Sequence, residues 1–171
     1  MAQPDWETCA EVTDIMEEFL EHFPQVFVGF DVNEIAAIKT KSKRSKKPVR
    51  LVTITYPRTC VCDKVYIVEA FEDRWDDLDR RRKRLAVFHT MLQIPEGGFD
   101  PESKSYGKRR KPEYELFLEE YAAAGGVPNW MENPAAVDPI EKAKAKASKK
   151  VDDVQRSPVT VEHIAGDDEE E

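Results

Sequence analysis

A histidine and a glutamine lie four residues apart in LAVFHTMLQIP, residues 85–95, a segment whose apolar spacing predicts a helix. Side chains at this spacing lie one above the other on a helix, so two histidines placed there can bind one zinc ion. In the zinc-hydrolase motif H-E-x-x-H, the glutamate after the first histidine is the general base. Here His89 and Gln93 occupy the two ligand positions, and Thr90 stands at the position of the base.

These residue types change the chemistry expected of the motif. A threonine hydroxyl gives up its proton very reluctantly near neutral pH, so Thr90 is not expected to act as a general base. The side-chain oxygen of Gln93 is a neutral, hard ligand that suits Ca²⁺ or Mg²⁺ better than Zn²⁺. The residues alone therefore favour a histidine that is hydrogen-bonded to a neighbour over a working hydrolase site.

A second candidate site is the basic segment KTKSKRSKKPVR, residues 39–50. Its seven cations are Lys39, Lys41, Lys43, Arg44, Lys46, Lys47 and Arg50. At the tip of a hairpin they would neutralise several phosphates and bind nucleic acid without sequence preference. The segment contains no aromatic residue for base stacking, which argues against recognition of single strands. The alternative is a solvated loop.

The elements that must position these residues follow from the apolar pattern. Strands are predicted at residues 33–40, 48–56 and 63–71, which are rich in β-branched and aromatic residues. An N-terminal helix follows a capping box of Thr8 and Glu11 and ends before Pro24. This order predicts an α+β domain with a small, three-stranded, antiparallel sheet.

Two further helices complete the predicted domain. One long helix covers residues 72–95, with the ion pairs Asp76–Arg80 and Asp77–Arg81 at i, i+4 and with Pro95 ending it. A following helix begins near Pro112 and ends at a pair of glycines. The long helix carries His89 on its inward face.

Composition bounds the class of protein. The chain has 171 residues and a net charge of −8, and 40% of its residues are hydrophobic. This size predicts one domain, residues 1–134, followed by a charged, low-complexity tail, residues 135–171, that is largely disordered except for a solvated helix. The acidic average disfavours nucleic-acid binding through the overall field. No apolar run is long enough for a membrane span, so a cytoplasmic protein without a membrane partner is expected.

Two segments carry a resemblance to a known family. DKVYIVEAFEDRWDDLDRRRKRLAVFHTMLQIPEGG, residues 63–98, resembles the strand, acidic turn and helix that lead to the motif H-E-L-L-H-I-P in that family. RRKPEYELF, residues 109–117, is similar to its last ligand-bearing segment. Residues 35–117 thus resemble the phage metallopeptidases, small zincin-like proteins of phages and prophages. The resemblance assigns zinc ligands to positions 89, 93 and 112 and the general base to position 90.

The chain departs from that family at the chemical positions. His89 matches the first ligand, whereas Thr90, Gln93 and Pro112 replace the base and the other two ligands. The resemblance therefore implies a protein-binding pseudoenzyme without a resident cofactor, whose partner is a phage or host protein and which works in the host cytoplasm or on the virion. One alternative is an active, metal-dependent peptidase that holds zinc with His89 and with carboxylates such as Glu96, Asp100, Glu113 or Glu115. The other is a nucleic-acid-binding accessory protein that uses residues 39–50.

Overall fold

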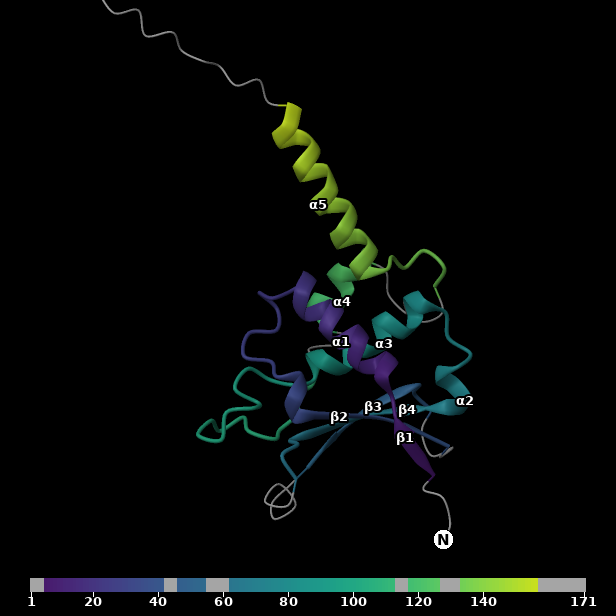
Figure 1. The fold of residues 1–171 in the computed structure, drawn as a ribbon, viewed down its shortest axis with the longest axis vertical. Helices are drawn as coiled ribbons and strands as arrows, with labels where there is room; N and C mark the ends of the chain where they lie inside the picture. Colours follow the sequence, from purple (N-terminus) through teal and green to yellow (C-terminus); the bar gives the residue numbers. More distant parts are fainter. Residues whose placement is uncertain (1–4, 42–45, 55–61, 113–116, 127–132, 157–171) are drawn as a thin grey trace, which may run out of the picture.

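A computed structural model of the chain describes residues 5–41, 46–54, 62–112, 117–126 and 133–156. A sheet lies beneath helices α1 and α3, which share one of its faces, and α5 extends away from this body (Figure 1). The strands are β1 (Trp6–Thr8), β2 (Ile35–Thr40), β3 (Val49–Thr53) and β4 (Tyr66–Phe71). The helices are α1 (Ala10–His22), η1 (Val32–Glu34), α2 (Glu72–Trp75), α3 (Arg80–Leu92), α4 (Leu118–Ala123) and α5 (Pro139–Arg156).

The predicted α+β class is confirmed, but the predicted sheet is wrong in two respects. The sheet has four strands in the order β1-β2-β4-β3, and β2 pairs with β4 in parallel. The strand β4 is central and buries one whole face, with Tyr66, Val68 and Ala70, whereas its other face carries Ile67, Glu69 and Phe71. The strand β1 has only three residues, all exposed, and so it lacks the alternation that predicts a strand.

The helix α1 supplies one wall of the core. Its buried residues Val12, Ile15, Met16 and Phe19 follow helical spacing, and the ring of Phe19 lies 4.7 Å from that of Phe88 in α3. The predicted capping box does not form. Thr8 pairs with Ile38 in the sheet, and Cys9 takes the N-cap position. Glu11 instead accepts a hydrogen bond of 2.8 Å from the indole Nε1 of Trp75.

The predicted long helix is two helices, α2 and α3. Asp79 caps α3 with an extended backbone, and its side chain accepts a hydrogen bond from the backbone N–H of Arg82 at 2.8 Å. An aspartate at the N-cap satisfies a backbone donor that would otherwise have no partner. Asp79 therefore begins a new helix, and the helix predicted for residues 72–95 is interrupted between Trp75 and Arg80.

Neither predicted i, i+4 ion pair forms among the described residues, because the side chains have partners from other elements. Asp76 binds Lys39 of β2 at 3.2 Å, and Arg80 binds Glu18 of α1 at 3.3 Å. Arg81 donates to the backbone oxygens of Pro134 and Ala136. The arginines of α3 thus join this helix to α1 and to the chain before α5.

The start of α5 belongs to the packed body, beyond the predicted domain end at residue 134. Ala136 and Ile140 are buried in the core. Arg84, whose side chain is 1% exposed, binds Glu18 at 2.8 Å, Asp138 at 2.8 Å and Glu141 at 3.3 Å. The predicted solvated helix corresponds to α5, and residues 157–171 of the predicted tail lie outside the described residues.

The ion pair between Arg84 and Glu18 changes the pKa of the glutamate. Burial alone would raise the pKa of Glu18, but the hydrogen bond and positive charge of Arg84 outweigh burial and lower the pKa below its usual value.

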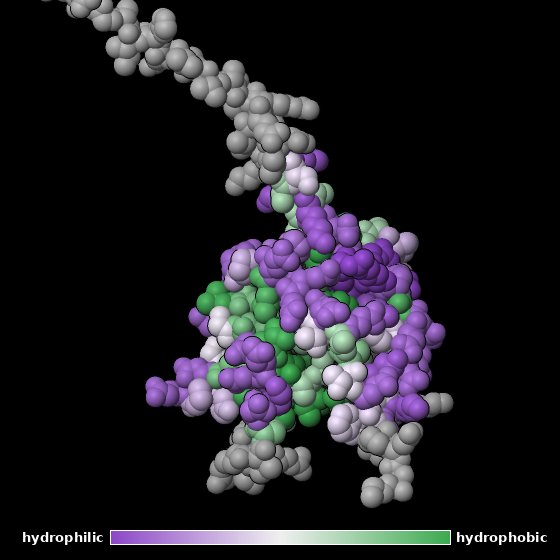
Figure 2. Space-filling model, in the orientation of Figure 1, coloured by the Kyte–Doolittle hydropathy of each residue, from purple (hydrophilic) through white to green (hydrophobic). Residues whose placement is uncertain are grey.

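Strongly hydrophilic residues gather over the beginning of α3 and the base of α5 (Figure 2). Within the described stretches, no helix combines the length and apolar character needed to cross a membrane.

Candidate functional site

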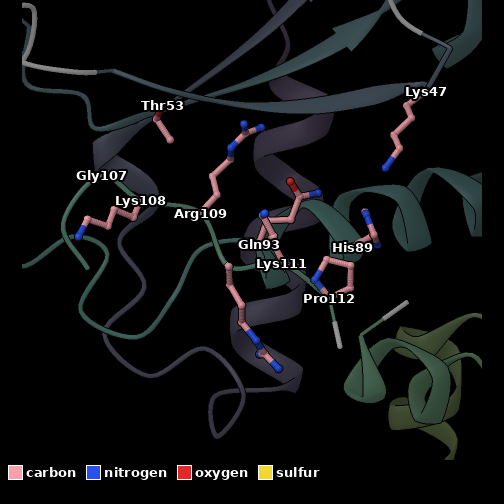
Figure 3. A pocket seen from close by; sticks show the side chains of 10 residues that line it. Lys47, Thr53, His89, Gln93, Gly107, Lys108, Arg109, Lys111 and Pro112 are labelled. Atoms are coloured by element: carbon pink, nitrogen blue, oxygen red, sulfur yellow. The ribbon is translucent and has the colours of Figure 1, made fainter. Parts of the chain in front are cut away.

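A pocket of about 490 Å³ lies beside strand β3 and the last turn of α3 (Figure 3). The structure brings His89, Gln93 and Pro112 together in its lining, although Pro112 is far from the other two in sequence. These are the three positions to which the sequence resemblance assigns zinc ligands. The other lining residues are Lys47, Thr53, Gly107, Lys108, Arg109, Arg110 and Lys111.

His89 is held in place by a carboxylate that the sequence did not single out. Its Nδ1 lies 2.7 Å from Oε2 of Glu120 in α4, a side chain with no exposed surface. Because Nδ1 is engaged with this carboxylate, Nε2 is the ring nitrogen that remains for other contacts. Histidine ligands of metals are commonly oriented through their second nitrogen in the same way. No pattern distinguishes Glu120 from the adjacent Glu119 in sequence.

Thr90 lies outside the pocket lining. Its side chain is buried, and its hydroxyl donates to the backbone oxygen of Ala86 at 2.8 Å, one turn earlier in α3. The hydroxyl is therefore engaged with the helix backbone. A residue in this state has no geometry for activating water in the pocket.

The pocket does not fit a zinc ion. Gln93 offers a neutral amide and Pro112 offers no side-chain ligand, which leaves His89 as the one strong zinc ligand among the described lining residues. The described part of the chain contains no group of three or more His, Cys, Asp or Glu residues placed to hold a metal.

The two described substitute ligands, Glu96 and Asp100, do not line this pocket. Glu96 lines a neighbouring pocket, and Asp100 accepts a hydrogen bond from the backbone of Glu102. Glu113 and Glu115 lie outside the described residues. A metal-dependent activity with these ligands therefore stays a prediction.

The loop between α3 and α4 is tied to the sheet by Tyr66. Its hydroxyl lies 2.8 Å from the backbone oxygen of Lys108 and 3.2 Å from that of Gly98, and burial raises the pKa of Tyr66 to about 12. A Cβ at Gly98 would lie 2.7 Å from this hydroxyl, so the close approach requires glycine. The N–H of Gly107 donates to the Gly98 oxygen at 3.0 Å. These contacts fix the start of the basic run 108–111.

The next residues of the run contact both walls of the pocket. The backbone N–H of Arg110 donates to the oxygen of Gln93 at 2.6 Å, and the guanidinium of Arg109 donates to the oxygen of Leu51 in β3 at 3.2 Å. The side chain of Arg110 pairs with Glu119 at 3.1 Å and lies over the ring of Phe117. The loop therefore bridges α3 and β3 through its basic residues.

The described lining is strongly cationic. It includes five lysine and arginine residues and no aspartate or glutamate. Lys108 and Lys111 are exposed and form no ion pair within the described residues. Like charges around one cavity raise the electrostatic potential inside it, so the pocket disfavours a metal cation and favours an anionic group.

The second predicted site, residues 39–50, is divided by the sheet topology. Lys39 binds Asp76 and Glu7, and its hydrogen bond to Asp76 raises its pKa. Arg50 binds Glu69 of β4. The strand β4 lies between β2 and β3, so these two strands are not two arms of one hairpin.

The other basic residues of this segment have different environments. Lys47 lines the pocket and Lys41 is exposed, whereas the backbone oxygen of Lys46 accepts a hydrogen bond from Arg74. Lys43 and Arg44 lie outside the described residues. Among the described residues of this segment, Lys47 alone lines the pocket.

Comparison of the chain with protein-family models, with curated proteins and with solved structures finds no match.

Proposed function

We propose that this protein is a non-catalytic, metallopeptidase-like protein that acts by binding another protein. The observation that carries the proposal is the convergence of His89, Gln93 and Pro112 on one pocket. The resemblance assigns these three positions to one zinc ion, and the three residues share a cavity. Gln93 offers only a neutral amide, however, and Pro112 has no side-chain ligand atom. The arrangement is that of a retained scaffold from which the chemistry has been lost.

The hydrogen bond between His89 and Glu120 supports the same proposal. A fully buried carboxylate is costly without a partner, and here it orients an imidazole toward the pocket. Thr90, at the position that the resemblance assigns to the general base, is engaged in a hydrogen bond to the helix backbone. As the resemblance implies, the proposed setting is a phage-infected or lysogenic cell, with a phage or host protein as partner.

Nucleic-acid binding through residues 39–50 has less support. Lys39 and Arg50 are each paired with carboxylates, which reduces the charge available to phosphates. Of the described cations of this segment, Lys47 lines the pocket.

The experiment that tests the proposed function is elemental analysis of protein purified from zinc-supplemented cells, with a general peptidase assay. The expected result is far less than one zinc per chain and no activity that depends on His89. A chain with stoichiometric zinc and with activity that is lost in His89→Ala would overturn the proposal.

A variant that restores ligands provides a matched control. Gln93→His with Pro112→His places three imidazoles around the pocket, so this variant is expected to bind about one zinc per chain. Its folding is checked by circular dichroism against the unmodified protein. A folded variant that binds no zinc would show that positions 89, 93 and 112 do not form the ancestral site.

A further inference from the structure

We infer that the pocket beside β3 binds an extended, acidic segment of the partner protein. This inference rests on the proposed function, since it names the chemistry of the partner. It is carried by the cations of the pocket and by the open edge of the strand beside it. Figure 3 shows Lys108 and Lys47 on opposite sides of the pocket, with His89 and Gln93 between them.

The cations supply the preference for carboxylates. Lys108 and Lys111 are exposed and have no ion partner among the described residues, and Arg109 contacts only a neutral backbone oxygen there. Unmatched cations around a cavity attract anionic groups and repel cationic ones. The Nε2 atom of His89 and the amide of Gln93 add hydrogen-bonding groups between them.

The edge of β3 supplies the preference for an extended peptide. Ile54 donates to the oxygen of Val65, and Phe71 donates to that of Pro48, so the even-numbered residues of β3 direct their backbone groups toward β4. Val49, Leu51 and Thr53 therefore direct theirs to the opposite side. No strand within the described residues pairs with β3 on that side. The oxygen of Leu51 already accepts a hydrogen bond there, from Arg109.

The pocket is lined by residues at both ends of β3. Lys47 precedes β3 and Thr53 ends it, and both line the pocket. The five residues of β3 span about 17 Å at the rise of an antiparallel strand. An extended segment can pair with this edge while its side chains on one face reach the lysines. A nucleic-acid backbone has no N–H groups to donate to the strand, so the edge favours a peptide.

The test uses fluorescence anisotropy with a labelled decapeptide that alternates glutamate and valine, titrated with the full chain at low salt. The glutamine counterpart of this peptide and a duplex DNA are titrated in parallel. The glutamate peptide is expected to bind, and the affinities of the glutamine peptide and of the DNA are expected to be lower by roughly tenfold or more. Preferential binding of the DNA would overturn the inference.

Charge reversals locate the site. Lys108→Glu with Lys111→Glu is expected to weaken peptide binding by roughly tenfold or more. The matched control is Lys104→Glu with Lys149→Glu, which changes the net charge equally at exposed positions outside the pocket. The control is expected to bind within about twofold of the unmodified chain, because screened distant charges act weakly. An equal loss in both variants would overturn the inference.

Backbone methylation tests the strand pairing. Two versions of the glutamate peptide carry N-methyl groups on alternate amides, one version on the odd positions and one on the even positions. Only one set of amides faces β3 in a paired strand, so only one version is expected to lose binding. Equal binding of both methylated versions would overturn the pairing with β3.

Zinc content separates this inference from the proposed function. Metal-free protein that fails to bind the glutamate peptide would overturn the acidic partner and leave the non-catalytic function standing. Stoichiometric zinc with activity dependent on His89 would overturn the function itself, whatever the peptide result.

Discussion

Two basic regions of this protein have similar composition and opposite surroundings. Residues 80–84 at the start of α3 meet carboxylates or backbone oxygens from α1 and from the chain around the start of α5. Residues 108–111 line a pocket without an acidic residue among the described lining. The first region holds helices together, whereas Lys108 and Lys111 of the second form no ion pair among the described residues. A basic run therefore indicates binding only when the fold does not supply its counter-charges.

The largest expected effect comes from breaking the first region. Arg84→Ala leaves Asp138 partly buried without its cation and Glu18 with only the exposed Arg80, so the free energy of unfolding is expected to fall by about 3–5 kcal/mol. Urea unfolding measures this change. Arg82→Ala, on the same helix with a more exposed side chain, is the control and is expected to cost less than about 1 kcal/mol. Similar losses in both variants would contradict the anchoring role of Arg84.

The second effect concerns the tether of the pocket loop. Tyr66→Phe removes the donor to the backbone oxygens of Lys108 and Gly98, so a loss of about 1–3 kcal/mol in unfolding free energy is expected. Tyr106→Phe is the control, because the described structure gives its hydroxyl no hydrogen bond. Thermal or urea unfolding compares the two. Equal stability of Tyr66→Phe and the unmodified chain would contradict the tether.

The third prediction uses pH to separate the two regions. The folded-state pKa of Glu18 is lowered, so its contribution to stability is present above its unfolded pKa of about 4.5 and is lost as the pH falls through the lower folded value. Glu18→Gln removes this contribution. Unfolding free energies at pH 7 and pH 3 are therefore expected to differ less in this variant than in the unmodified chain. An unchanged difference would contradict the role of Glu18.

The smallest effect is expected at the pocket cations. Lys108→Ala with Lys111→Ala is expected to change the unfolding free energy by less than about 0.5 kcal/mol, because both side chains are exposed and unpaired among the described residues. The same urea titration measures it. A loss comparable to that of Arg84→Ala would show that the two regions do not differ in the way the structure indicates.

Local patterns predicted much of this fold. The N-terminal helix was predicted to end before Pro24 and α1 ends at His22, and the three longer strands lie within the predicted segments. Contacts between distant segments were not predicted. The parallel pairing of β2 with β4 and the break before Arg80 depend on partners that local periodicity does not reveal.

The candidate site was also predicted only in part from the sequence. The positions 89, 93 and 112 came from a resemblance along the sequence, and they share one pocket. Glu120 and Arg109 were missed, because their roles depend on contacts with His89 and with the oxygen of Leu51, which are far away in sequence. The cationic character of the pocket was missed for the same reason. Lys47 and residues 108–111 come together in the pocket only after the chain has folded.

The proposed function requires that the pocket lined by His89, Gln93 and Pro112 binds no zinc. Native mass spectrometry of the full chain, purified from zinc-supplemented cells and compared with His89→Ala, tests it most directly. The account predicts a metal-free mass for both proteins. A mass that includes one zinc ion in the unmodified chain, and not in His89→Ala, would contradict it.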